Sequence, residues 1–171
     1  MKYLVLIDGM PDNGKTTAAN KLGESGFGNI SLDTAYVAFI EQRYKQLYFA
    51  DLDKFIAPHF NEIVTPGYQR LGLYPDILTD WTQWVVDKIM KAGTDNVVCE
   101  GYLLRPRDET LSLSSPLRSR FSSSAIVRLV TAKKTVQGYK LYESGNEVSL
   151  DDLTPPPASG SPRKPSGCEV F

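Results

Sequence analysis

The sequence predicts a three-layer α/β fold with a mostly parallel sheet and a helical insertion. The first sign is the apolar run over 2–8, which is short and ends at Asp8-Gly9, as buried parallel strands do. A glycine-rich turn and a helical pattern follow it directly. The second sign is a pair of further apolar runs, over 96–100 and 125–131. Strands that alternate with helical patterns in this way are typical of a parallel sheet covered by helices.

The first half of the predicted sheet carries acidic residues where its strands end. A helix is expected over 15–25, and a short second strand around Ile30 and Leu32, with Asp33 at its end. Glu100 ends the strand over 96–100. Because ligands of open α/β sheets bind at the carboxyl ends of the strands, we expect Asp33 to face the same crevice as the glycine-rich turn. Glu100 is expected there for the same reason.

The middle of the chain, over 34–95, is expected to form the helical insertion. From 34 to about 64, apolar residues recur at three- and four-residue steps. A clear amphipathic helix is expected over 76–93. Trp81 and Trp84 share its apolar face, so we expect both rings in the core rather than stacked on a nucleobase.

The C-terminal part divides into four segments. Residues 105–124 are polar and rich in Pro, Arg and Ser, and we expect a mobile excursion, with a short helix as the alternative. A strand over 125–131 follows, and then a hairpin that turns at 144–146. From 154 to 171 the chain is rich in Pro, Gly and Ser, which predicts a disordered tail and limits the folded domain to 1–153.

Composition narrows the class of protein. A length of 171 residues is typical of one domain with a sizeable core. With 19 basic and 20 acidic side chains the net charge is −1, which argues against an extended nucleic-acid-binding surface. Two cysteines and one histidine cannot build a disulfide framework or a Cys/His metal cluster. No apolar run approaches the roughly 18 residues of a membrane span, so we expect a cytoplasmic protein without membrane contact. The oligomeric state is left open.

The stretch after the first strand has the spacing G-x-x-x-x-G-K-[ST], the Walker A motif or P-loop. Glycines let the backbone wrap an anion so that successive N–H groups point inward. The helix that begins at about Lys15 turns its positive N-terminal end toward the same anion. The motif therefore predicts a nucleotide-phosphate site, whose ATP-binding residues are Gly9, Asp12, Asn13, Gly14, Lys15, Thr16 and Thr17.

The order of elements and motifs resembles the P-loop kinases that phosphorylate small molecules, the nucleoside and nucleotide kinases, over roughly residues 2–131. The Gly14-Lys15-Thr16-Thr17 ending looks like that of thymidylate kinases. Leu32-Asp33-Thr34 resembles a segment that opens the acceptor site of cytidylate kinases, and Glu100-Gly101 resembles the end of the third strand in uridine-kinase-like enzymes. The resemblance implies a three-layer P-loop NTPase fold with sheet order 2-3-1-4. The insertion would then lie on the acceptor side.

The motif and the resemblance assign roles to individual side chains. Lys15 is expected to bridge the outer phosphates and to stabilise charge during phosphoryl transfer. Thr16 and Glu100 are the expected Mg²⁺ ligands, Glu100 through a metal-bound water. Asp33 is expected to accept or orient the proton of the attacking hydroxyl, with a helix N-cap as the alternative. The predicted acceptor-binding residues are Asp33, Tyr36 and Glu100.

Arginines between the third and fourth strands are candidates for clamping phosphates, as lid arginines do in the resembled kinases. Arg105 and Arg107 are the two expected to act in catalysis, and Arg118 and Arg120 are further candidates. The chain departs from the family beyond Thr131, where it has no arginine before the tail and no clear helix. The lid is therefore either the segment that bears these arginines or a reduced one.

The predicted function is an ATP- and Mg²⁺-dependent kinase acting on a hydroxyl or phosphate of a small molecule, with a nucleoside or nucleotide as the leading acceptor. One alternative is a 5′-hydroxyl kinase for nucleic-acid ends, which the near-neutral net charge does not favour. Another is a nucleotide-binding regulatory ATPase or switch protein, which would need a water-positioning residue and a partner surface.

Overall fold

The computed structural model describes residues 2–36, 38–39, 42, 76–105 and 112–155. Most of the predicted helical stretch over 34–64 lies outside the described residues, as do Arg107 and most of the predicted tail.

A six-stranded mixed sheet forms the centre of the described fold, with the strand order β2-β3-β1-β4-β5-β6. The first four strands of that order pair in parallel, and β5 and β6 add two antiparallel pairings beyond β4. The strands are β1 (Lys2–Asp8), β2 (Gly28–Ser31), β3 (Asn96–Glu100), β4 (Ala125–Thr135), β5 (Gly138–Glu143) and β6 (Asn146–Val148). The expected α/β class and the order 2-3-1-4 are confirmed. A mostly parallel sheet is not confirmed, because β5 and β6 add two antiparallel pairings to the three parallel ones.

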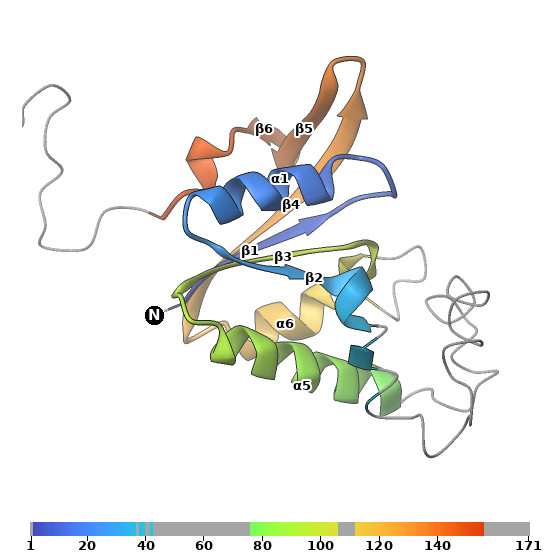
Figure 1. Ribbon diagram of the computed structural model, residues 1–171, viewed down its shortest axis with the longest axis vertical. Coiled ribbons are helices and arrows are strands. Elements are labelled where there is room, and N and C mark those ends of the chain that lie inside the picture. Colours follow the sequence, from blue (N-terminus) through green and yellow to red (C-terminus); the bar gives the residue numbers. More distant parts are fainter. Residues whose placement is uncertain (1, 37, 40–41, 43–75, 106–111, 156–171) are drawn as a thin grey trace, which may run out of the picture.

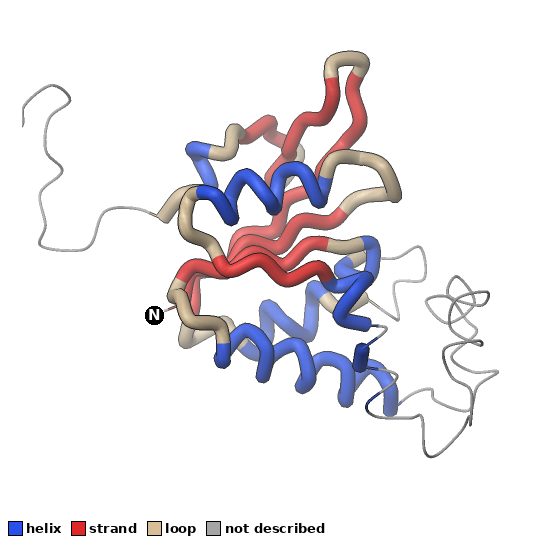
Figure 2. Tube along the Cα trace, viewed as in Figure 1, coloured by secondary structure: helices blue, strands red, loops and turns tan. Residues whose placement is uncertain are grey.

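Helices cover both faces of the sheet, which gives three layers (Figures 1 and 2). On one face lies α1 (Lys15–Glu24), and on the other lie α5 (Asp76–Lys91) and α6 (Ser114–Arg120). Alternate residues of β1 point to opposite faces, so Leu4 and Leu6 pack with α5 and α6 whereas Val5 and Ile7 pack with α1. Burial on both faces is why β1 is apolar along its length.

Three predicted elements differ from the structure at their boundaries. Strand β2 ends at Ser31, and residues 32–36 are helical, so Leu32 and Asp33 belong to the helix rather than to the strand. Leu32 is fully buried in the core, which explains why it looked like part of a strand. The polar excursion contains α6, as the alternative allowed. Strand β4 runs four residues past the predicted end, because its outer half pairs with β5.

An ion pair anchors the β5–β6 extension to the parallel part of the sheet. Arg128 on β4 donates to both carboxylate oxygens of Glu143, from Nε at 2.8 Å and from Nη2 at 2.6 Å. Arg128 Nη1 also donates to the backbone carbonyl of Asp152, in the 3₁₀ turn η3 (Asp151–Leu153) that follows the hairpin. A bidentate pair fixes orientation as well as distance, so the hairpin has a defined position beside β4.

In the described part of the chain, no helix combines the length and the apolar character that crossing a bilayer requires.

Candidate functional site

The loop between β1 and α1 wraps tightly against the neighbouring strands. Gly9 and Gly14 have φ angles of 145° and 91°, which L side chains rarely adopt. A Cβ on Gly9 would lie 2.6 Å from the carbonyl oxygen of Ala132, and one on Gly14 would lie 2.5 Å from the Cβ of Tyr139. Asp12 between them also has a positive φ, of 64°. The two motif glycines are therefore required by space and by backbone conformation together.

Helix α1 begins as the motif predicts. Its first hydrogen bond runs from the Ala18 N–H to the Gly14 carbonyl, at 2.9 Å. The N–H groups of residues 15–17 precede any helical acceptor, so they remain to bind an anion at the N-terminus of the helix.

Lys15 lies inside the loop and not on the surface. Its side chain is buried, and Nζ donates to the Met10 carbonyl at 2.8 Å. Burial raises the pKa of Asp8, Asp33 and Glu100, and the positive charge of Lys15 opposes that rise at all three, so the ammonium faces the ends of several strands at once. A lysine held in this way is positioned to meet the outer phosphates of a nucleotide in the loop.

Two carboxylates meet the loop from neighbouring elements. Glu100 at the end of β3 is buried, and its Oε1 accepts a hydrogen bond from the Thr16 hydroxyl at 3.3 Å. Asp33 is half-buried in the first turn of the helix after β2, and its Oδ1 accepts no hydrogen bond from the described residues. Because Ser31 precedes this helix, Asp33 is not its N-cap. The predicted meeting of these carboxylates at one edge of the sheet is confirmed.

The two carboxyl groups titrate above their ordinary range. Burial raises the pKa of Glu100, and repulsion from Asp33 raises it further, against hydrogen bonds from the Ser31 and Thr16 hydroxyls and the charge of Lys15. Burial also raises the pKa of Asp33, against the charge of Lys15 and a backbone hydrogen bond from Tyr102. Two carboxyl groups whose negative charges are only partly compensated therefore lie beside the loop, and such a site favours a cation or a proton.

The charge of Glu100 is expected to cost the ligand-free protein stability. Since the folded-state pKa of Glu100 is raised, the folded protein holds its proton more tightly, and the free energy of unfolding falls as pH rises through that pKa. Glu100→Gln keeps an oxygen acceptor for Thr16 and removes the charge. We expect its melting temperature at pH 7 to exceed the wild-type value by about 2–4 °C. Calorimetry from pH 4 to pH 8 should show the difference shrinking toward acid; an equal gain at every pH would contradict the charge argument.

Gly101 sets the position of Asp33. A Cβ at Gly101 would lie 2.9 Å from the Cβ of Leu32 and 3.0 Å from Oδ1 of Asp33. The Gly101 N–H donates to the Ile7 carbonyl at 3.1 Å, so the backbone there is fixed to β1 and cannot retreat.

Gly101→Ala is therefore expected to displace the helix that carries Asp33. We expect a loss of about 1–3 kcal/mol in the free energy of unfolding, measured by urea denaturation. Gly93→Ala is the matched control, because a Cβ at Gly93 meets nothing within 4 Å. Equal stability of the two variants would show that this close approach has no energetic consequence.

The arginine candidates lie in different places. Arg105 follows the 3₁₀ turn η1 (Tyr102–Leu104), and its Nε lies 3.1 Å from Oδ2 of the buried Asp8 at the end of β1. Arg105 is therefore at the predicted edge of the sheet, with its guanidinium partly exposed. Arg118 and Arg120 are exposed at the end of α6, which leads into the start of β4. These two candidates are therefore surface residues at the end of the strands opposite the loop.

Tyr36 packs inside the core. It is fully buried, edge-on to Trp81 with ring centroids 5.1 Å apart, and 6.0 Å from Phe39. Trp81 is buried and stacks on the half-buried Trp84 at 5.7 Å. The expectation that the Trp81 ring is a core ring is confirmed. Tyr36, which was predicted to contact an acceptor, joins the same aromatic cluster, so its ring lies in the core and not at the surface beside the loop.

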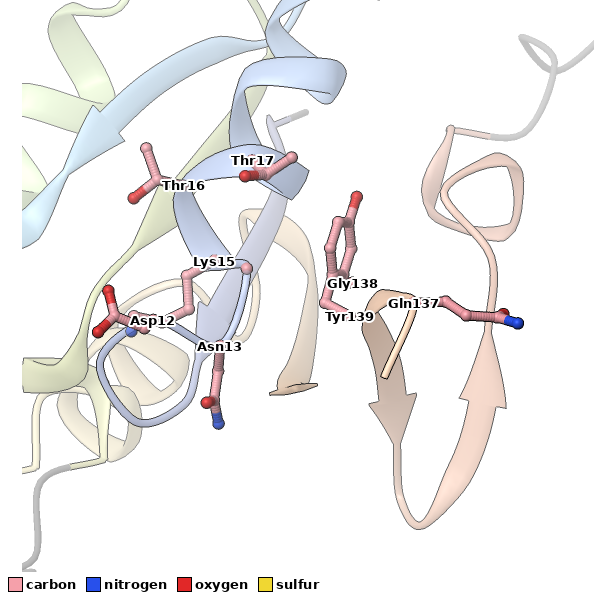
Figure 3. A pocket seen from close by; sticks show the side chains of 9 residues that line it. Asp12, Asn13, Lys15, Thr16, Thr17, Gln137, Gly138 and Tyr139 are labelled. Atoms are coloured by element: carbon pink, nitrogen blue, oxygen red, sulfur yellow. The ribbon is translucent and has the colours of Figure 1, made fainter. Parts of the chain in front are cut away.

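A cleft of about 580 Å³ opens between the loop and the β4–β5 turn (Figure 3). The loop side of its lining holds six predicted ATP-binding residues, which are Asp12, Asn13, Gly14, Lys15, Thr16 and Thr17. The other side consists of Gln137, Gly138 and Tyr139, which the sequence analysis did not single out. Residue spacing in the sequence could not predict that these three residues line the cleft, because their position depends on how the β4–β5 hairpin folds back beside α1. The signal that was present is the aromatic residue directly after the Gln137-Gly138 turn.

No protein-family model matches this chain, and no curated protein matches it either.

Proposed function

We propose that the protein is an ATP- and Mg²⁺-dependent phosphotransferase of the P-loop NTPase fold, and that it moves the γ-phosphoryl group to a hydroxyl or phosphate of a small molecule. The observation that carries this proposal is the meeting of four side chains at the ends of β1, β2 and β3. The Lys15 ammonium and the Thr16 hydroxyl come from the loop and α1. The carboxylates of Asp33 and Glu100 approach from the other side.

The residues present fit a magnesium ion bound together with nucleotide phosphates. Mg²⁺ prefers oxygen ligands and is usually held by one or two carboxylates plus phosphate oxygens, with waters completing the shell. Thr16 and Glu100 supply a hydroxyl and a carboxylate oxygen 3.3 Å apart, and the raised pKa of Glu100 marks a negative charge that a cation would stabilise. Bound there, the ion would neutralise charge on the transferred phosphoryl group.

Lys15 and Asp33 have different roles in the proposed phosphoryl transfer. The bond from the γ-phosphorus to its bridging oxygen breaks as the acceptor oxygen bonds to that phosphorus, and the nucleoside diphosphate leaves. Lys15 stabilises the charge on the outer phosphates. Asp33 takes the proton of the attacking hydroxyl, a role that suits a carboxylate whose pKa is raised toward neutral pH and whose Oδ1 has no described donor.

A small acceptor, and first a nucleoside or nucleotide, is the substrate class we favour. It rests on the resemblance of the Leu32–Thr34 segment and of Glu100-Gly101 to nucleotide and nucleoside kinases. The net charge of −1 does not favour a nucleic-acid acceptor.

The test is a transfer assay with γ-labelled ATP, Mg²⁺ and separate acceptors: nucleosides, nucleoside monophosphates and an oligonucleotide with a 5′-hydroxyl end. Labelled product with a nucleoside or nucleotide supports the proposal. Product with the oligonucleotide alone would replace it by an end-phosphorylating kinase. Phosphate release that no acceptor changes would replace it by an ATPase or switch, and the absence of both transfer and ATP binding would overturn the assignment of the loop.

A further inference from the structure

The loop lies in the middle of the sheet, so its two sides differ in what they offer a bound nucleotide. On one side, β3 and β2 bring Glu100 and Asp33. On the other side, β4 and β5 bring the turn at Gln137-Gly138 and the ring of Tyr139. A triphosphate lying along the loop must direct its reacting end toward the carboxylates. The nucleoside at its other end therefore leaves toward β4 and β5.

Tyr139 is the side chain that a nucleoside on the β4–β5 side of the loop would contact. Figure 3 shows the Tyr139 ring standing beside the first turn of α1, next to Thr17 and across the loop from Asp12. In P-loop sites the lysine reaches the β- and γ-phosphates while the backbone cradles the α- and β-phosphates, so the helix's first turn lies near the inner phosphate. A half-buried ring next to Thr17 is thus within reach of the sugar and base.

The position of this ring is fixed by the fold. Tyr139 is the second residue of β5, directly after the turn from β4; it is paired with Lys134 of β4 and packs at the edge of the core that includes α1. It contacts Gly14 so closely that a Cβ there would lie 2.5 Å from its Cβ. A second cleft, of about 360 Å³, continues past Tyr139 along β5 and β6. The ring therefore stands between two open spaces, with room for a planar group on its exposed face.

We propose that the β4–β5 hairpin forms the nucleoside subsite of the donor site, with the Tyr139 ring as the surface on which the base packs. The inference rests on the proposed function, because it takes the loop to bind a nucleoside triphosphate. Beyond the proposed function, the inference says which residue the nucleobase of ATP would contact, and it places that residue on β5, a strand that pairs antiparallel to β4.

The test compares Mg-ATP with Mg-tripolyphosphate, which has the phosphates and no nucleoside, by isothermal titration calorimetry on the full chain. Wild-type protein is expected to bind ATP more tightly than tripolyphosphate. Tyr139→Ala is expected to weaken ATP binding roughly tenfold or more and to leave tripolyphosphate binding unchanged. Tyr139→Phe keeps the ring and is expected to bind like the wild type.

Tyr142→Ala is the matched control, since Tyr142 lies on the same strand but faces the other side of the sheet, under the ammonium of Lys133. It is expected to leave both affinities unchanged. Equal losses of ATP and tripolyphosphate binding in Tyr139→Ala would overturn the inference, since the ring would then support only the loop. Equal binding of the two ligands by the wild type would overturn it as well.

A measurement on the wild type alone guards against a variant that does not fold. Nuclear Overhauser contacts between the Tyr139 ring protons and the base protons are expected in the ATP-saturated protein, and their absence overturns the inference. Failure of the wild type to bind either ligand is a different result, because it removes the proposed function itself.

Discussion

Lys15→Ala is expected to lower the rate of phosphoryl transfer strongly while leaving the fold intact. The ammonium is the one charge that the loop places among the strand ends, where it offsets the negative charges of Asp8, Asp33 and Glu100. Removing a preorganised group that stabilises transition-state charge lowers kcat by about 10²–10³-fold. The ATP affinity should fall too, because the same group meets the outer phosphates in the ground state.

The matched control for this variant is Lys21→Ala, which removes an exposed lysine from the last turn of the same helix. It is expected to keep the wild-type kcat. Circular dichroism of both variants checks the fold, and transfer is measured with γ-labelled ATP and the best acceptor of the panel. Wild-type turnover by Lys15→Ala would exclude the loop from the reaction.

Asp33→Asn is expected to lower kcat and to leave ATP binding nearly unchanged. The carboxylate faces the loop from the side of β2 and is not part of the loop proposed to bind ATP, so its loss would remove the proposed proton acceptor and spare the proposed donor site. General-base catalysis contributes about 10²–10⁴-fold, which sets the size of the expected loss.

The pH profile separates a base from a residue that only positions the acceptor. Burial raises the pKa of Asp33 above its ordinary value of 3.8, so wild-type kcat should fall as the solution is acidified through that raised pKa and the base becomes protonated. Asp33→Asn should lose this acid limb. Asp87→Asn, an exposed site on α5 that accepts a hydrogen bond from Gln83 at 2.8 Å, is the control. An unchanged acid limb in Asp33→Asn would assign the titration to another group.

Local sequence was enough to predict the elements whose patterns are complete within a few residues. The apolar run of β1, the glycine and lysine spacing of the loop, the amphipathic stripe of α5 and the turn at 144–146 each appear where they were expected. The end of strand β2 was predicted less accurately. Leu32 is buried, and a single buried apolar residue fits the end of a strand as well as the start of a helix.

The meeting of Thr16 with Glu100 was also within reach of the sequence. Parallel strands end at one edge of a sheet, so the start of the helix that follows β1 lies near the end of β3, and Thr16 meets Glu100 although the two lie 84 positions apart in the chain. The tertiary structure decided what pattern does not encode: which arginine lies near that edge, and what stands on the other side of the loop. Arg105 pairs with Asp8 while Arg118 lies at the far end, because α6 leads into the start of β4.

The sequence by itself determined the glycine-rich loop between β1 and α1 and the acidic edge beside it, because both follow from residue spacing and from the direction of parallel strands. The partner of the loop on its other side was decided only in three dimensions. Tyr139 reaches Gly14 because β5 pairs with the outer half of β4, and the ion pair of Glu143 with Arg128 fixes β5 to the inner half of the same strand. Such a contact depends on the register of an antiparallel pairing, and no local period in the chain specifies it.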